Sequence, residues 1–193
     1  MFRKFHAAAF ALTICALFTS LPAHALDNPK RDHLTEQEAD LVREAQELDK
    51  RTDVFIRAAE RRLQAINGTP AAAASSKQAQ KELDKWGPLP KGTRAELLAD
   101  FAKILDEAIN NIDDVAARDA KNPLVSKSLR KLAAAVNTFL PQISAMRNSA
   151  RDGEELAALE EALDNMQQIT EAANRLPPPT EDKKGKNKKD KSE

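Results

Sequence analysis

The chain has 193 residues, of which 30 are basic and 30 are acidic, so its formal net charge is zero. A balanced chain lacks the basic excess by which a whole protein recognises nucleic acid. Charged and aliphatic residues are abundant, glycines are few and tyrosine is missing, a composition that favours long α-helices over a sheet. The length is sufficient for one domain with its own core.

Residues 1–25 have the three parts of a secretory signal peptide. Arg3 and Lys4 supply a positive start, a short apolar stretch follows, and an A-x-A cleavage site ends at Ala25. The alternative is an uncleaved anchor, but the apolar stretch is shorter than the roughly 20 residues that span a bilayer. We therefore expect cleavage and export, to the periplasm or to the outside of the cell.

Cleavage would remove Cys15, the only cysteine of the chain. The mature protein would then have no disulfide in an oxidising compartment, and packing alone would have to stabilise it. His33, in a polar lead-in over residues 26–34, would be the only histidine left. No later segment is apolar enough to span a membrane, so the mature chain is expected to have no transmembrane span.

Apolar residues that recur every three or four positions predict four long amphipathic helices. Two of them begin with a T-x-x-E capping box, Thr35 with Glu38 and Thr93 with Glu96. The linker over residues 68–92 is rich in proline and glycine but can hold one short helix, at about 77–86. The long helices are expected at about 35–66, 93–121, 123–151 and 153–176.

We predict an all-α fold in which these four helices pack as a four-helix bundle over residues 35–176, with one long irregular connection between the first and second. The last helix has an apolar seam at coiled-coil spacing. Pro141 is expected to kink its helix without ending it. Residues 177–193 are rich in proline and lysine and should be disordered. The apolar stripes are broad enough to serve a homodimer as well.

The side chains that most enzymes use are scarce in the mature chain. Without cysteine or tyrosine, and with one histidine, it lacks Cys–His nucleophiles, zinc ligands of the Cys/His type and the Glu-x-x-His pairs of di-iron bundles. It contains neither a G-x-S-x-G elbow nor a glycine-rich phosphate loop. We expect no enzyme, no catalytic residue and no cofactor.

A polar column on the second long helix is the only weak metal candidate. Asp106, Asn110 and Asp113 recur on one face and could offer oxygen ligands to a hard cation such as Ca²⁺. The alternative is an ordinary solvated face, because bundle metal sites project inward. A second column, beside the apolar stripe, is expected to pair with arginines of a neighbouring helix: Asp100, Glu107, Asn111 and Arg118.

Trp86 is the one large aromatic residue with a polar group, and it lies in the irregular linker. With Pro88 and Pro90 it could form a binding surface, since tryptophan and loop residues are favoured at such places. The alternative is that Trp86 closes one end of the bundle as a buried side chain.

These observations favour an exported, non-enzymatic helical bundle that binds a partner protein or an anionic envelope surface. The last thirteen residues hold six lysines and four acids, which suits such a surface or a solubility tail. The alternative is a bundle that binds a small ligand or a cation, through the acidic column or a cavity near Pro141 and Trp86. A third hypothesis, an enzyme that works by Arg, Lys and Glu electrostatics, requires an inward-facing Arg–Glu cluster in an accessible cavity.

Overall fold

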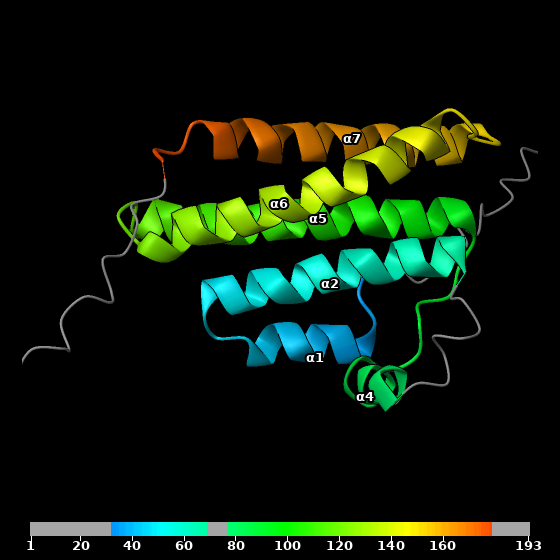
Figure 1. The fold of residues 1–193 in the computed structure, drawn as a ribbon, viewed down its shortest axis with the longest axis horizontal. Helices are drawn as coiled ribbons and strands as arrows, with labels where there is room; N and C mark the ends of the chain where they lie inside the picture. The colour runs from blue at the N-terminus through cyan, green and yellow to red at the C-terminus, as the bar shows by residue number, and fades with distance from the viewer. Residues whose placement is uncertain (1–31, 69–76, 179–193) are drawn as a thin grey trace, which may run out of the picture. The chain divides into compact units, whose positions relative to one another are not determined.

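All regular structure in the described part of the chain is α-helical, which confirms the all-α prediction. The computed structural model describes residues 32–68 and 77–178, so the predicted signal peptide and most of the lysine-rich tail lie outside the described residues. Within these ranges no helix is both long and apolar enough to cross a membrane. The six helices of these ranges are drawn in Figure 1: α1 Glu36–Glu44, α2 Leu48–Asn67, α4 Lys77–Trp86, α5 Arg94–Arg118, α6 Pro123–Arg147 and α7 Gly153–Asn174.

The prediction of one continuous helix over about 35–66 is wrong. The chain leaves the helix at Ala45 and α2 begins at Leu48, so that α1 folds back along α2 (Figure 1). No glycine or proline marks this turn, and the apolar periodicity continues through it. The fold-back brings Glu38 beside Arg62, which a continuous helix would place about 36 Å away. Pairing of these buried charges favours the break.

The predicted count of four helices is therefore also wrong, because the described ranges contain six. The break adds one helix, and α4 is the other short one. The expected long connection over residues 68–92 is described only in part, since 69–76 lie outside the described ranges. Its second part holds α4, where the short helix at about 77–86 was expected.

Both predicted capping boxes are formed. At the start of α1, the Thr35 hydroxyl accepts the Glu38 N–H at 3.3 Å, and the Glu38 carboxylate accepts the Thr35 N–H at 2.9 Å. Thr93 and Glu96 repeat the arrangement at the start of α5, at 3.2 and 2.7 Å. Each box satisfies backbone donors that the first helical turn leaves free.

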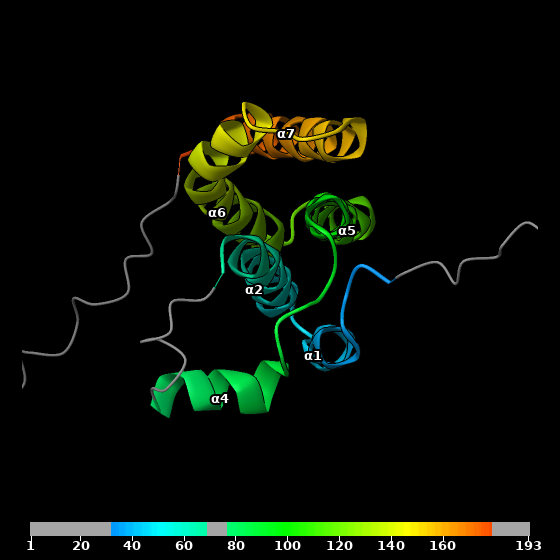
Figure 2. The same ribbon diagram turned by 90° about the vertical axis from the view of Figure 1, so that its right-hand side faces the viewer.

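The main core lies between α2, α5, α6 and α7. α5 packs against α2 on one side and α7 on the other, and α6 crosses from α2 to α7 (Figures 1 and 2). Phe101 of α5 meets Phe139 of α6 edge to face, with ring centroids 5.5 Å apart. The large apolar side chains that are sealed from solvent are Phe55, Leu98, Phe101, Ile104, Leu105, Leu132, Ile143, Leu159, Met166 and Ile169.

α6 passes through Pro141 without ending, and runs on to Arg147. Proline lacks the N–H that would bond to the preceding turn, but Pro141 is on the exposed side of the helix. Ile143 and Met146, which follow it, are still buried. The second half of α6 therefore continues to cover the core while the helix passes from α2 toward α7 (Figure 1).

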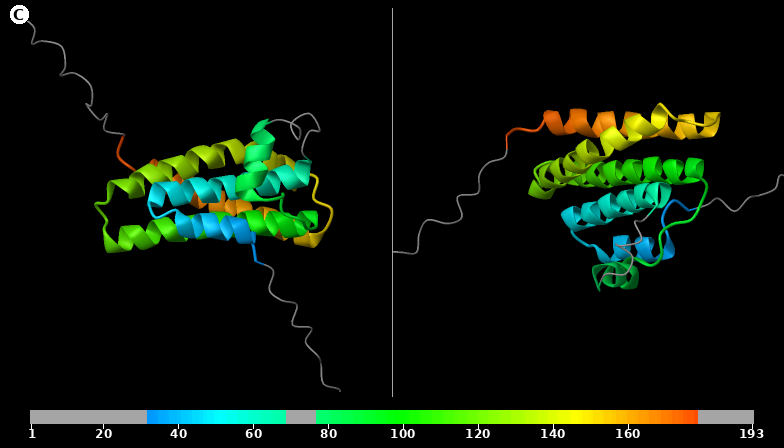
Figure 3. Two further views of the ribbon diagram at one scale, coloured as in Figure 1. Left: turned by 90° about the horizontal axis from the view of Figure 1, so that it is seen from below. Right: turned by 45° about the vertical axis from the view of Figure 1, so that its right-hand side comes forward.

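α1 and α4 lie outside the four longer helices. α1 packs on α2 on the side away from α7, and α4 contacts α1 (Figures 2 and 3). Arg57 links α4 to α2, because its guanidinium bonds to Glu82 of α4 at 2.7 Å and to Glu60 of its own helix at 2.8 Å. The candidate site is positioned by α1 and α4, and by the Arg57 contacts that tie α4 to α2.

Candidate functional site beside Trp86

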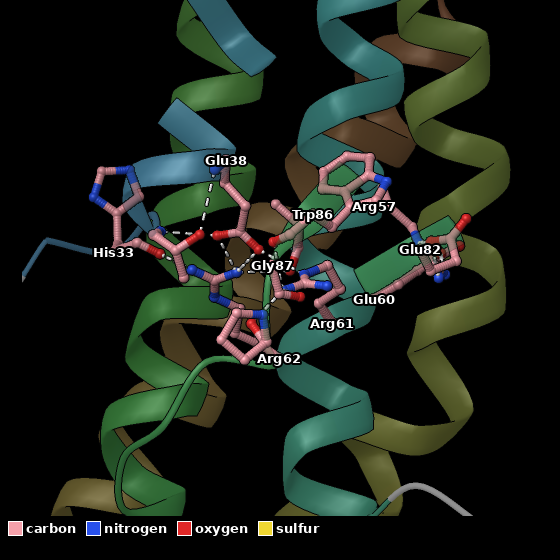
Figure 4. A network of polar contacts seen from close by, with 12 residues as sticks. His33, Glu38, Arg57, Glu60, Arg61, Arg62, Glu82, Trp86 and Gly87 are labelled. Atoms are coloured by element: carbon pink, nitrogen blue, oxygen red, sulfur yellow. Dashed lines mark hydrogen bonds and ion pairs between the residues drawn. The ribbon is translucent and has the colours of Figure 1, made fainter. Parts of the chain in front are cut away.

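Glu38 is the centre of a buried charge cluster. As the third residue of α1 it accepts the Thr35 N–H, and the same carboxylate accepts hydrogen bonds from Arg61 Nε at 2.9 Å and Arg62 Nη1 at 2.6 Å. Figure 4 shows the carboxylate of α1 and the two guanidinium groups of α2 pointing toward one another. Glu38, Arg61 and Arg62 are 0%, 3% and 1% exposed, so water does not reach the three charges.

Arg62 joins the start of the described chain to α2. Its Nη1 bonds to both oxygens of Glu38 and to the Ala58 carbonyl oxygen, at 2.6, 2.6 and 3.2 Å. Its Nη2 donates to the carbonyl oxygen of His33. The buried Nε has no hydrogen-bond partner among the described residues. One guanidinium thus holds the first turn of α1 and the segment before it.

Arg61 holds the loop between α4 and α5. Its Nη2 donates to three successive carbonyl oxygens, of Trp86, Gly87 and Pro88, at 3.0, 3.2 and 2.6 Å (Figure 4). Gly87 has φ +67°, a conformation that glycine adopts readily and that turns the chain here. The guanidinium carbon also lies 5.9 Å from the centroid of the Trp86 ring, within the range of a cation–π contact.

The cluster holds two positive charges and one negative charge away from water. Burial lowers the pKa of Arg61, and the hydrogen bond that its guanidinium donates to Glu38 partly offsets that effect. The carbonyl oxygens around the two arginines supply the remaining negative partial charge. Buried charges are costly unless they are fully paired, so this cluster is favourable only when α1, α2 and the loop after α4 are all in place.

The chemistry open to Glu38 is limited by its partners. Each of its two oxygens accepts two hydrogen bonds, counting the backbone N–H of Thr35. A carboxylate engaged in this way has little capacity left to accept a substrate proton. The Arg–Glu cluster that the third hypothesis requires is therefore present, but it is sealed from solvent and its carboxylate is fully engaged.

The surface near this cluster contains a pocket of about 470 Å³ bordered by Trp86. The pocket lies where the α1–α2 turn, the first half of α2 and the end of α4 meet. Apolar groups and charged groups both line it. Its apolar residues are Leu41, Ala45, Val54 and Trp86, and its polar residues are Glu44, Gln46, Glu47, Lys50, Asp53 and Lys85.

The three residues predicted to form a binding surface are not exposed together. Trp86 is 5% exposed and Pro90 is buried, whereas Pro88 is exposed. The indole ring is covered because it packs under Arg61 and Lys85, with the lysine nitrogen 5.5 Å from the ring centroid. Trp86 thus lines the pocket as a buried side chain instead of projecting from the surface as an anchor.

The predicted metal column, Asp106, Asn110 and Asp113, lies on the exposed side of α5. The Asn110 amide donates to a carboxylate oxygen of Asp106 at 3.1 Å. No group of three or more His, Cys, Asp or Glu residues close enough to hold a metal ion occurs within the described ranges. A cation site in this column stays a prediction without further support.

The second polar column joins α5 to other segments. Asn111 accepts a hydrogen bond from Arg51 of α2 at 3.1 Å, the kind of pairing that was expected. Glu107 pairs instead with the ring of His33, whose Nε2 lies 2.7 Å from its Oε2. His33 belongs to the predicted polar lead-in, and this contact places it on α5.

Sequence reasoning missed Arg61 and Arg62 as interior residues. Ala59 and Ile66 mark the core-facing stripe of α2, and Arg62 occupies the stripe position between them. An arginine in that place signals a buried partner, because an isolated charge there would be too costly. Glu38 lies three residues before Leu41, on the apolar stripe of α1, and is therefore the corresponding candidate for a buried partner. Its capping role already accounted for a glutamate at this position, so the second role was overlooked.

Comparison with known proteins finds no relative of this chain. No protein-family model, no curated protein and no solved structure matches the chain.

Proposed function

We propose that this protein is an exported, non-enzymatic helical protein that binds a partner protein in the pocket beside Trp86. The observation that carries the proposal is the composition of that pocket, an apolar floor of Leu41, Val54 and Trp86 inside a charged rim. An apolar centre with a polar rim is the usual anatomy of a protein interface. The sealed Glu38 cluster, whose carboxylate is fully engaged, supports a binding role over a catalytic one.

The pocket is held in shape before any partner arrives. Its floor comes from three elements, and the Glu38 cluster bonds those three elements together through Arg61 and Arg62. A surface that is already ordered loses less conformational entropy on binding. Apolar side chains could also pack at the place where the ionic cluster is buried. Preorganisation of the pocket would explain why charged side chains are found there.

The charges of the rim indicate what kind of segment would fit. Three acidic side chains and two lysines line the pocket, which leaves one excess negative charge: Glu44, Glu47, Asp53, Lys50 and Lys85. We therefore expect a partner segment with apolar side chains and a basic residue next to them. The charged contacts would favour the encounter, while the apolar floor would contribute most of the affinity.

We also interpret α2, α5, α6 and α7 as a four-helix bundle that carries α1 and α4 on its outside. Its support is the packing order, in which α2 contacts α5, α5 contacts α7, α7 contacts α6, and α6 contacts α2. Four helices that contact in a closed ring bury their apolar stripes against one shared core.

The partner can be identified by photo-crosslinking in the cell of origin. A benzophenone amino acid at Val54, which lines the pocket, is expected to give one recurrent crosslinked protein. The same group at Asn137, on the exposed side of α6, serves as the control. Equal products from both positions, or no product at Val54, would contradict the proposal.

The protein captured in that experiment must then bind directly and through the pocket. Val54→Lys adds a positive charge to a half-buried wall position, and should weaken binding of the purified partner by about tenfold or more. Asn137→Lys adds the same charge elsewhere and should leave the Kd unchanged. Titration calorimetry with both variants separates the pocket from a general charge effect.

Export is tested separately, by the mass of the protein purified from its own cells. The proposal expects the mature chain to begin at Leu26, after the A-x-A site of residues 23–25. A chain that keeps its first 25 residues and remains in the cytoplasm would contradict export. That result would not bear on the pocket, which is tested by the crosslinking and the calorimetry.

A further inference from the structure

We propose a second binding site, for a small organic carboxylate with an aliphatic body, in the pocket between the end of α2, the start of α5 and the second half of α6. The pocket has a volume of about 400 Å³, within the usual range of small-ligand sites. It is lined by Ile66, Asn67, Arg94, Gln142, Ala145, Met146, Ser149 and Arg151. No acidic side chain is among them, and two are arginines.

Arg94 has unused hydrogen-bonding capacity at this pocket. Its Nε is buried and has no hydrogen-bond partner among the described residues. The nearest carboxylate oxygen, of Glu155, lies 3.9 Å from this nitrogen, and the Ser149 hydroxyl oxygen lies at the limit of a hydrogen bond, 3.5 Å from Nη2. A carboxylate that enters the pocket would meet donors that the protein itself leaves poorly satisfied.

The charge balance favours an anion. Glu155 is 4% exposed and lies behind the pocket wall, where its Oε2 accepts the backbone N–H of Arg151 at 3.0 Å. It can neutralise one of the two arginines. The Arg151 side chain is exposed and makes no hydrogen bond within the described ranges, so one positive charge remains over. A guanidinium group binds carboxylate or phosphate oxygens in a forked geometry.

The apolar residues of the lining select the rest of the ligand. Ile66, Ala145 and Met146 are apolar, so a bare inorganic anion would leave them without a partner. Asn67 and Gln142 lie between this pocket and a smaller one along α2 and α6, and their amides are joined at 3.3 Å. A carboxylate with a short aliphatic chain fits both kinds of lining residue.

The test uses the mature full-length protein and four probes at matched ionic strength: acetate, hexanoate, 1-hexanol and inorganic phosphate. Isothermal titration calorimetry should give a Kd for hexanoate about tenfold or more below that for acetate, because several methylene groups leave water. Hexanol should show no saturable binding. Phosphate that binds as tightly as hexanoate, or the absence of binding by both carboxylates, would overturn the proposal.

Matched variants show whether the observed binding is at this pocket. Arg151→Gln removes an exposed charge and should weaken hexanoate about tenfold, whereas Arg118→Gln at the far end of α5 should have no effect. Ala145→Glu should weaken binding much more than Ala145→Gln, since the two differ in charge and hardly in size. Equal effects within either pair would overturn the assignment. None of these residues lines the Trp86 pocket, so this result is independent of the proposed partner.

Discussion

Glu38 performs two tasks with one carboxylate. It caps the first turn of α1 through Thr35, and it neutralises Arg61 and Arg62 in the interior. The first task is local and follows from the T-x-x-E spacing. The second depends on residues 23 and 24 positions away, so the spacing within α1 does not show which residues Glu38 pairs with.

Because Glu38 has both roles, a small change in its side chain should have a large effect on the free energy of unfolding. Glu38→Gln keeps the size of the side chain but leaves two guanidinium groups buried without a counter-charge. We expect the free energy of unfolding to fall by about 3 kcal/mol or more, measured by urea denaturation at neutral pH. Glu44→Gln, at an exposed position of the same helix, should change it by less than about 0.5 kcal/mol. A similar small loss for both variants would show that Glu38 is not essential to the cluster.

The pairing of Asp49 with Lys127 predicts that the stability of the protein depends on pH. The Lys127 ammonium donates a hydrogen bond to the buried Asp49 carboxylate at 2.6 Å and holds the pKa of Asp49 below its usual value, against burial, which raises it. The unfolded chain then takes up a proton more readily than the folded chain. The contribution of Asp49 is therefore complete above its ordinary pKa of about 3.9, and is lost as the pH falls through the lower folded-state value.

Asp49→Asn is the variant that isolates this effect. It should lower the free energy of unfolding at pH 7 by about 1–2 kcal/mol, and the difference from the wild type should shrink as the pH falls below about 4. Urea denaturation between pH 3 and pH 7 measures this. Asp113→Asn, at an exposed position on α5, is the control. A loss of stability that is independent of pH would contradict the assignment to the Asp49 carboxylate.

At the scale of elements, the turn after α4 depends on a glycine. Gly87 has φ +67°, and a Cβ there would lie 3.1 Å from the Gln37 side chain. Gly87→Ala should therefore destabilise the protein by about 1 kcal/mol or more, because alanine resists this conformation. Gly153→Ala, in the first turn of α7 where a Cβ would have open space, should be neutral or stabilising. Thermal denaturation of the pair would contradict this account if both variants shift the midpoint in the same direction by similar amounts.

The break between α1 and α2 is the element that sequence periodicity could not predict. Apolar residues continue in phase across Ala45 and Leu48, and no breaker residue interrupts them. In the structure Arg51 Nε donates to the Ala45 carbonyl oxygen at 3.1 Å, which satisfies an acceptor that the end of α1 leaves free. The N-cap residue of α2, Glu47, makes no capping bond with its side chain. The turn is stabilised by contacts with neighbouring segments.

At the scale of the whole molecule, the layered packing predicts an order of local opening. α5 packs against α2, α6 and α7, whereas α4 packs closely only against α1 and is otherwise tied to α2 by hydrogen bonds of Arg57 and Arg61. Hydrogen exchange followed by mass spectrometry should find the amides of α5 most protected and those of α4 least. Glu38→Gln should accelerate exchange in α1 and in residues 86–90 without affecting α7. Equal acceleration in all helices would mean that the cluster stabilises the molecule as one unit.

The sequence by itself determined the helical class and the capped starts of α1 and α5, because these follow from periodicity and from contacts within a few residues. Local spacing also placed Asp106, Asn110 and Asp113 on one exposed face. Only the tertiary structure decided the break between α1 and α2, the burial of Trp86, and the pairing of Glu38 with two arginines. These depend on which distant segments meet, and a buried charge selects its conformation through a partner that lies far away in the chain.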